Sequence, residues 1–376
     1  MRALFKPHYL KILSFLTVVL AWFILVEREA QINSPPLFSS GLYNAYRTEW
    51  NAPTSTPTLQ DHQQFVERLR RASDPIEIKR IYLNHAVNHL WADYLFDLAP
   101  WNGQLSKYLL STQQQLHEDP KFNGIHEPRL EDQFYYGNLP SKVSEIQGCS
   151  LIRIGQPMIY SNGLTRWITT PQPSPEFLQF IQGQKSHLYV NLMKREGEEG
   201  PLSRSLEKLG ATLPNLLVVT LDKNSDFYHQ KEPLQADFKT TFLNKLIDKN
   251  GAYSFPDSLS EDELVALILA VQEHFFNGNS PETIDERKDF IELTYIALFD
   301  RLVEKYQPQS MNITCKQGID RGPSLMALWL YSHHAMPDQE IAVQLLAPPL
   351  LFHNRASHLS RIERFNSAAL RLNTHM

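Results

Sequence analysis

Cys315 and Arg321 are the residues whose types and spacing most directly suggest chemistry. They bracket the segment Cys-Lys-Gln-Gly-Ile-Asp-Arg, with a short apolar run before the thiol and helix-forming residues after the guanidinium. This pattern predicts a tight loop between a strand and a helix. In such a loop, successive backbone N–H groups point toward one position, and the positive end of the helix dipole lies there. A dianionic phosphate group fits a position of this kind.

Each residue of this loop has a distinct expected role. Gly318 permits the backbone conformation that a tight turn needs. Arg321 can hold two phosphoryl oxygens with its planar fork, which a lysine does less well. The same positive field favours the thiolate of Cys315, the form that attacks phosphorus. The other cysteine, Cys149, has Gly155 at the equivalent offset, so we expect an ordinary buried thiol there.

The loop C-K-x-G-x-D-R resembles the signature of the cysteine-dependent phosphatases, and most of all their lipid- and inositol-phosphate branch. That branch includes effector phosphatases secreted by intracellular bacterial pathogens. The resemblance covers the loop and, more loosely, residues 188–334. It implies Cys315 as nucleophile, Arg321 as phosphate clamp and Lys316 as a phosphate or inositol-phosphate contact. The remaining substrate-binding positions implied are Gln317, Gly318, Ile319 and Gly322.

Two positions depart from the family pattern. Family members usually place Thr or Ser after the arginine, where the hydroxyl assists the departing thiolate; here Gly322 and Pro323 precede Ser324. Loops selective for polyphosphoinositides are often basic at the position of Ile319. The first departure leaves open a catalytically inactive, membrane-anchored phosphate-binding protein.

A phosphatase also needs a general acid to protonate the leaving oxygen. Asp320 lies inside the loop, as in the myotubularin-like pattern. Asp257, in Ser-Phe-Pro-Asp, resembles the acid loop of tyrosine phosphatases at a longer distance upstream. Asp257 also has a purely structural interpretation, because it precedes a helix that Ser260 and Glu263 can cap. We favour Asp320; Asp222, at the end of an expected strand, ranks third.

Composition excludes several other classes of protein. The chain has 376 residues, 42% of them hydrophobic, with 36 basic and 41 acidic residues and a net charge of −5. This balance argues against a polytopic membrane protein, a disordered chain or a nucleic-acid binder. Two cysteines rule out a disulfide scaffold and a thiolate zinc cluster. His333 and His334 lack convergent acidic partners, and no glycine-rich nucleotide loop is present, so we expect no metal and no cofactor.

The N-terminus predicts a membrane segment. Residues 12–26 carry no charge, follow a basic flank and extend to residues 9–26 if Lys11 snorkels. We expect an uncleaved single-pass anchor, with a cleaved signal peptide as the alternative. The localisation expected is therefore the membrane, with secretion by a bacterial pathogen as a further possibility from the resemblance. The arginine-rich tail after His353 is either a helix packed on the body or one lying on an anionic bilayer.

The chain divides into four expected regions: 1–28 anchor, 29–58 linker, 59–175 mostly helical, and 176–376 phosphatase-like. Strands are expected at 187–193, 216–221 and 311–314, and helices at 202–209, 263–276, 290–306 and 325–331. This alternation predicts an α/β fold with a central mixed or parallel sheet flanked by helices. The resemblance makes that fold tyrosine-phosphatase-like.

The expected function is hydrolysis of phosphomonoesters through a cysteinyl-phosphate intermediate. Phosphoinositides or inositol phosphates are the preferred substrates, because of Lys316, Asp320 and the expected anchor. A protein-tyrosine or dual-specificity phosphatase is the enzymatic alternative.

Overall fold

The computed structural model describes residues 141–159, 170–232, 237–335 and 357–373, together with residues 114, 115, 118 and 119. The chain divides into two units, Met1–Glu49 and Trp50–Met376, and all described residues belong to the second. The expected anchor and linker lie outside the described residues, as does most of the expected helical region.

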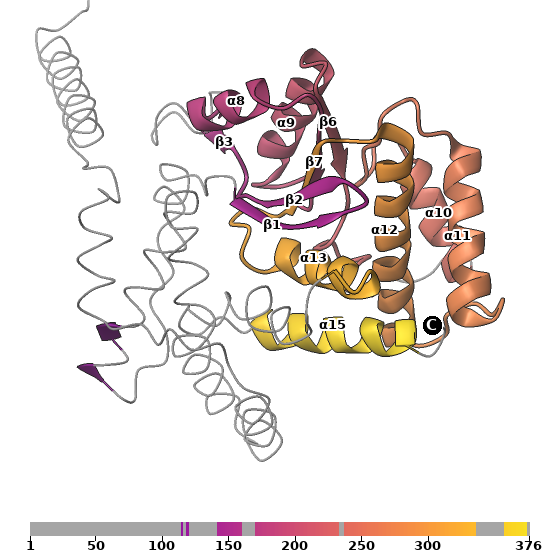
Figure 1. Ribbon diagram of the computed structural model, residues 1–376. Coiled ribbons are helices and arrows are strands. Elements are labelled where there is room, and N and C mark those ends of the chain that lie inside the picture. Colours follow the sequence, from indigo (N-terminus) through magenta and orange to yellow (C-terminus); the bar gives the residue numbers. More distant parts are fainter. Residues whose placement is uncertain are drawn as a thin grey trace, which may run out of the picture. The chain divides into compact units, whose positions relative to one another are not determined.

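Strands and helices alternate through the described part of the chain (Figure 1). The strands are β1 Ser141–Ile146, β2 Cys149–Arg153, β3 Met158–Ile159, β4 Gln172–Pro173, β5 His187–Asn191, β6 Leu216–Thr220 and β7 Ser310–Thr314. The helices are α8 Pro175–Gln182, α9 Gly200–Thr212, α10 Phe238–Ile247, α11 Glu261–Phe276, α12 Ile284–Tyr306, α13 Arg321–Ser332 and α15 Ser357–Asn373.

Five of these strands form one mixed sheet in the order β1-β2-β7-β5-β6. Only β1 is antiparallel to its neighbour; β2, β7, β5 and β6 run parallel. Strand β7 is central, and all of its residues are buried, as expected for a strand covered on both faces. The expected α/β class, with a mixed sheet flanked by helices, is confirmed.

Alternating side chains of β5 divide the core between the two faces of the sheet. Leu188 and Val190 belong to the larger apolar cluster, which also takes in residues of α10 to α13. Tyr189 points to the other face, where it packs edge-on against Phe177 of α8 in a cluster that includes α9. Figure 1 shows α8 and α9 on one side of the sheet and α11, α12, α13 and α15 on the other. Burial of both faces fixes the register of the sheet, because a one-residue slip would exchange the two sets of side chains.

The expected strands 187–193, 216–221 and 311–314 are present as β5, β6 and β7, and the four expected helices are present as α9, α11, α12 and α13. The sheet, however, begins at Ser141, within the region expected to be mostly helical. The run around Leu151 is a strand because it pairs with β7, with Ser150 opposite Ser310. Helix α12 begins at Ile284 rather than near residue 290. Thr283 and Glu286 form a capping box at this earlier start.

The expected membrane localisation requires correction. In the part of the chain that the structure describes, no helix combines the length and apolar character needed to cross a bilayer. The apolar run at residues 9–26, on which that expectation rested, lies outside the described residues.

The arginine-rich tail forms helix α15, which packs on the body of the protein. Ala368, Ala369 and Leu372 are buried in the main core. Arg364 pairs with Asp289 of α12, and the Arg371 guanidinium lies 4.4 Å from the centre of the Phe276 ring. Of the two interpretations of the tail, the packed helix is therefore correct.

A buried histidine makes the fold sensitive to acid. His187 is the first residue of β5. Its ring nitrogens lie 2.8 Å from Ser310 Oγ and 2.7 Å from Asn312 Oδ1 of the neighbouring strand β7. Burial lowers the pKa of His187 to about 4, so the ring is neutral in the folded state while the unfolded chain protonates near pH 6.5. The stabilisation that the neutral ring gives the folded state is complete above pH 6.5 and is lost as the pH falls toward 4.

We expect the free energy of unfolding to fall by about 3 kcal/mol across this pH window. Urea titrations of the protein and of His187→Gln check this, since the variant should lack that part of the slope; equal slopes would contradict it.

Candidate active site

The segment from Cys315 to Asp320 is the loop that joins the carboxyl end of β7 to helix α13. Because β7 is central, the ends of its neighbours surround this loop. Arg153, the last residue of β2, donates from Nη2 to the Gly318 carbonyl at 3.1 Å. Thr314 Oγ1 donates to the Ile154 carbonyl, which follows β2. The loop thus lies where parallel α/β sheets place their ligands, at the carboxyl edge.

Two glycines let the loop and the helix approach the sheet. Gly318 has φ +65°, and a Cβ there would lie 2.8 Å from the Ile154 carbonyl oxygen. A Cβ on Gly322 would lie 2.5 Å from the Ile313 carbonyl oxygen and 2.8 Å from Thr314 Cα. Since these obstacles are backbone atoms, neither position accepts a side chain without moving the loop. A hydroxyl-bearing side chain directly after the arginine, as cysteine-dependent phosphatases usually have, therefore has no room at position 322.

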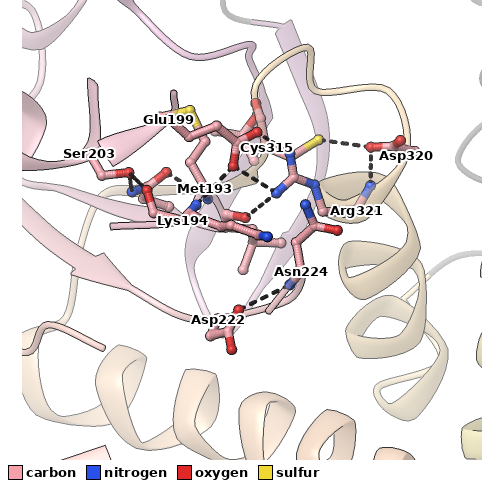
Figure 2. Close-up of polar contacts among 12 residues, drawn as sticks. Met193, Lys194, Glu199, Ser203, Asp222, Asn224, Cys315, Asp320 and Arg321 are labelled. Carbon is pink, nitrogen blue, oxygen red and sulfur yellow. Dashed lines mark hydrogen bonds and ion pairs between the residues drawn. The ribbon is translucent and has the colours of Figure 1, made fainter. Parts of the chain in front are cut away.

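The thiol of Cys315 meets the carboxylate of Asp320. The Cys315 Sγ–H donates to Asp320 Oδ1 at 3.2 Å, and the same oxygen accepts the Arg321 backbone N–H at 2.6 Å (Figure 2). Asp320 is thereby both the N-cap of α13 and the proton acceptor of the thiol. Cys315 is buried, with 1% of its surface exposed.

Arg321 is held by three hydrogen bonds from its terminal nitrogens. Nη1 donates to the Leu192 carbonyl at 2.8 Å and to Glu199 Oε2 at 3.2 Å, while Nη2 donates to Glu199 Oε1 at 2.6 Å. A guanidinium has five N–H donors. The remaining two, on Nε and Nη2, share one edge of the group and have no partner among the described residues. That edge is available to hold two oxygens of one phosphate.

The charges of this ion pair reinforce each other. Burial alone would lower the pKa of Arg321, but Glu199 and Cys315 outweigh burial and raise it further. Burial likewise opposes ionisation of Glu199, yet the Arg321 guanidinium lowers the pKa of that carboxyl, with a smaller contribution from Lys316. Arg321 is therefore always charged, at the N-terminus of a 12-residue helix whose dipole adds positive charge.

The other expected loop residues have different surroundings. Lys316 is half-buried, and its charge acts on Glu199, so it lies on the same side of the site as the ion pair. Gln317 and Ile319 are buried, with 9% and 3% of their surface exposed. Ile319 packs its side chain inside the protein, so only its backbone is suited to contact a substrate.

Asp257 is not brought to Cys315. It is exposed, and its loop begins at Ser254, which bridges to Thr220 on the edge strand β6. Three strand spacings, about 14 Å, therefore separate Ser254 from β7. Ser260 and Glu263 form the capping box of α11 that the structural interpretation of this segment required. Asp222 accepts hydrogen bonds from the backbone of Asn224 and Ser225, which makes it a turn-capping carboxylate.

The surroundings of the Cys149 thiol make it unreactive. It is buried at 1% exposure, and burial, aided by Glu145, raises its pKa to about 12. This confirms the expectation of an ordinary buried thiol.

Three partners of the loop were missed by the sequence analysis. They are Glu199, the Leu192 carbonyl and Arg153. The signal for Glu199 is the acidic run 196–199 just beyond an expected strand, where the buried arginine of a neighbouring loop needs an acid.

Two cavities of about 340 Å³ each lie near this edge of the sheet. One is lined by Tyr253, Asp257 and neighbours, and the other by residues that include Lys194, Asp222 and Phe227. Cys315 and Arg321 line neither. The second cavity adjoins the site, because the Lys194 backbone N–H donates to Glu199 at 2.9 Å.

Comparison with known proteins yields no match: neither a family model, nor a curated protein, nor a solved structure corresponds to this chain. Within the described residues, no three His, Cys, Asp or Glu side chains gather as metal ligands. Function is therefore argued from the geometry of the site itself.

The Arg321–Glu199 ion pair should stabilise the folded protein as well as orient the Arg321 guanidinium. Replacing Glu199 by Gln leaves a buried guanidinium without its acid, and we expect a loss of about 3 kcal/mol in the free energy of unfolding. Glu207→Gln, on the same helix, is the matched control. It breaks a somewhat more exposed pair in which Arg195 keeps three backbone carbonyl partners, so we expect a loss of about 1 kcal/mol. Urea unfolding measures both, and equal losses would contradict a special role for the first pair.

Proposed function

We propose that this protein hydrolyses phosphomonoesters through a cysteinyl-phosphate intermediate on a tyrosine-phosphatase-like α/β body. One observation carries the proposal. At the carboxyl end of the central strand, a thiol, a carboxylate and a guanidinium with an unoccupied edge lie together at the start of a helix. The C-x5-R resemblance of the loop supports the same reaction class.

The thiol and the carboxylate exchange one proton in the proposed first step. Asp320 takes the proton of Cys315, leaving a thiolate beside Arg321 and a neutral carboxylic acid. The thiolate attacks phosphorus, the P–O bond to the leaving alcohol breaks, and the acid returns the proton to that oxygen. The proton that activates the nucleophile is thus the one the leaving group needs.

Arg321 stabilises the charge of the transition state. Its Nε and Nη2 edge holds two equatorial oxygens, while Glu199 fixes the plane of the guanidinium. In the second step, Asp320 removes a proton from water, the water oxygen attacks phosphorus, and the P–S bond breaks. Asp320 then passes this proton to the departing sulfur, phosphate leaves, and Cys315 and Asp320 regain their starting states. Phosphoinositides or inositol phosphates are the proposed substrates, since Lys316 adds positive charge on the Glu199 side of the site.

A phosphate-binding protein without turnover is a second candidate. The observations that favour it are the 1% exposure of Cys315 and the absence of space for a hydroxyl at position 322. Such a protein keeps the Arg321 edge and loses only the chemistry of the sulfur. The next experiment separates the two candidates.

Turnover of a fluorogenic phosphate ester should depend on Cys315 and not on Cys149. We expect Cys315→Ser to lose at least about 10³-fold in kcat, because the alcohol is a far weaker nucleophile than the thiolate. Cys149→Ser removes the other thiol, buried away from the loop, and should keep the rate of the wild type. Equal rates in the wild type and Cys315→Ser, or no turnover in either, would overturn the enzymatic proposal.

The identity of the general acid is tested through the leaving group. Asp320→Asn should reduce kcat strongly for an alkyl phosphate, whose alkoxide needs a proton, and much less for p-nitrophenyl phosphate, whose phenolate leaves unaided. Asp257→Asn should leave both rates unchanged. A selective loss of alkyl phosphate turnover in Asp257→Asn would transfer the role to that residue.

A further inference from the structure

A buried group of charged side chains lies beside the candidate active site, between the end of β6, α12 and α15. Lys223 Nζ donates to Glu292 Oε2 at 2.6 Å, and the Tyr228 hydroxyl donates to the other oxygen of Glu292. Arg364 pairs with Asp289. All of these residues are at least nine-tenths buried, so each charge must be balanced locally.

One cation in this group, Arg361, has no counter-charge among the residues that the structure describes. Arg361 is buried at 8% exposure, and its Nε has no hydrogen-bond partner. Within the described residues, its guanidinium joins no ion pair. Buried arginines are almost always paired, because an uncompensated buried charge is costly. This exception needs an explanation.

The neighbours of Arg361 increase the excess of positive charge. Burial, and after it the charge of Arg361, lower the pKa of Lys223 to about 8, although the Glu292 carboxylate acts in the opposite direction. The pKa of His229 is also lowered, first by burial and then by Arg361. Cations that disfavour one another's charge in the empty protein are stabilised together when an anion enters between them.

This group lies on the same edge of the sheet as Cys315. The Arg361 carbonyl accepts from Ser324 Oγ at 3.5 Å, and the Ser324 backbone N–H donates to the Asp320 carbonyl at 3.0 Å. The backbone of Arg361 therefore contacts α13 one turn, or about 5.4 Å, beyond the end of the loop. Lys223 follows β6, two strand spacings or about 10 Å from β7.

We propose that Arg361, backed by Lys223, binds a second phosphate group of a ligand whose first phosphate lies in the Cys315 loop. The choice of ligand rests on the proposed function: an inositol carrying two phosphates, either free or as a lipid headgroup. Arg361 supplies from the C-terminal helix the positive charge that Ile319 does not supply within the loop. A dianionic phosphate neutralises the excess cation with charge-assisted hydrogen bonds.

Binding to the full chain tests the proposal, with inositol 1-phosphate and inositol 1,4-bisphosphate as probes in calorimetry. Arg361→Gln should weaken bisphosphate binding about 10- to 100-fold and leave monophosphate binding unchanged, as expected for one lost charge-assisted contact. Arg364→Gln is the matched control: it removes a paired arginine of the same helix and should keep the ratio of the two affinities. A water-soluble short-chain phosphatidylinositol 4-phosphate, whose headgroup has phosphates at the same two positions as the free probe, provides the lipid arm; tighter binding than inositol 1,4-bisphosphate identifies the headgroup as the source, and weaker binding identifies the free form.

Thermal unfolding without ligand distinguishes a binding residue from a structural one. Arg361→Gln should melt at the same temperature as the wild type or higher, because an unpaired buried charge is removed. Arg364→Gln should melt lower. A lower melting temperature for Arg361→Gln, or equal weakening of both probes, would overturn the subsite, as would a wild type that binds neither probe. Arg361-dependent bisphosphate binding without turnover would instead retain the subsite and reject the proposed hydrolysis.

Discussion

The ion pair between Arg321 and Glu199 is the interaction on which the candidate site depends. It joins the first residue of α13 to the N-cap of α9, across the ends of β7 and β5. Because burial makes an unpaired guanidinium costly, the acid must be present for the loop to adopt this conformation. Glu199 occupies the end of the guanidinium and so leaves the edge formed by Nε and Nη2 to face a ligand. Stability and orientation therefore come from the same two side chains.

The loop combines several tasks in few residues. The Asp320 carboxylate caps a helix with one oxygen and receives the thiol hydrogen on that same oxygen. Neighbouring strands hold the loop through its backbone: Arg153 binds the Gly318 carbonyl, and Thr314 reaches across to β2. Rigid support of this kind allows a short loop to keep the thiol and the guanidinium in a fixed relation.

The sequence was most informative where the pattern is local. The apolar runs of β5, β6 and β7 predicted buried parallel strands, and the helices between them followed from their spacing. The C-x5-R spacing located the loop correctly between a strand and a helix. Contacts between segments that lie far apart in the sequence could not be predicted from these local patterns. Glu199 meets Arg321 across 122 residues, and β2 joins the central sheet through its pairing with the distant strand β7. Asp257 illustrates the opposite case: a familiar tripeptide suggested an acid, and the segment that carries it bridges to the edge strand β6 rather than to β7.

The tight packing of Gly322 has a consequence for the timing of the proposed reaction. Without a hydroxyl to hydrogen-bond the departing sulfur, breakdown of the phosphorylated cysteine has less help than its formation. In the proposed reaction the second half of the cycle is therefore the slower one, and the proposal implies that most molecules at steady state carry the covalent adduct. In that case the phosphate taken from the substrate would stay bound to Cys315 for far longer than the noncovalent complex with the substrate lasts.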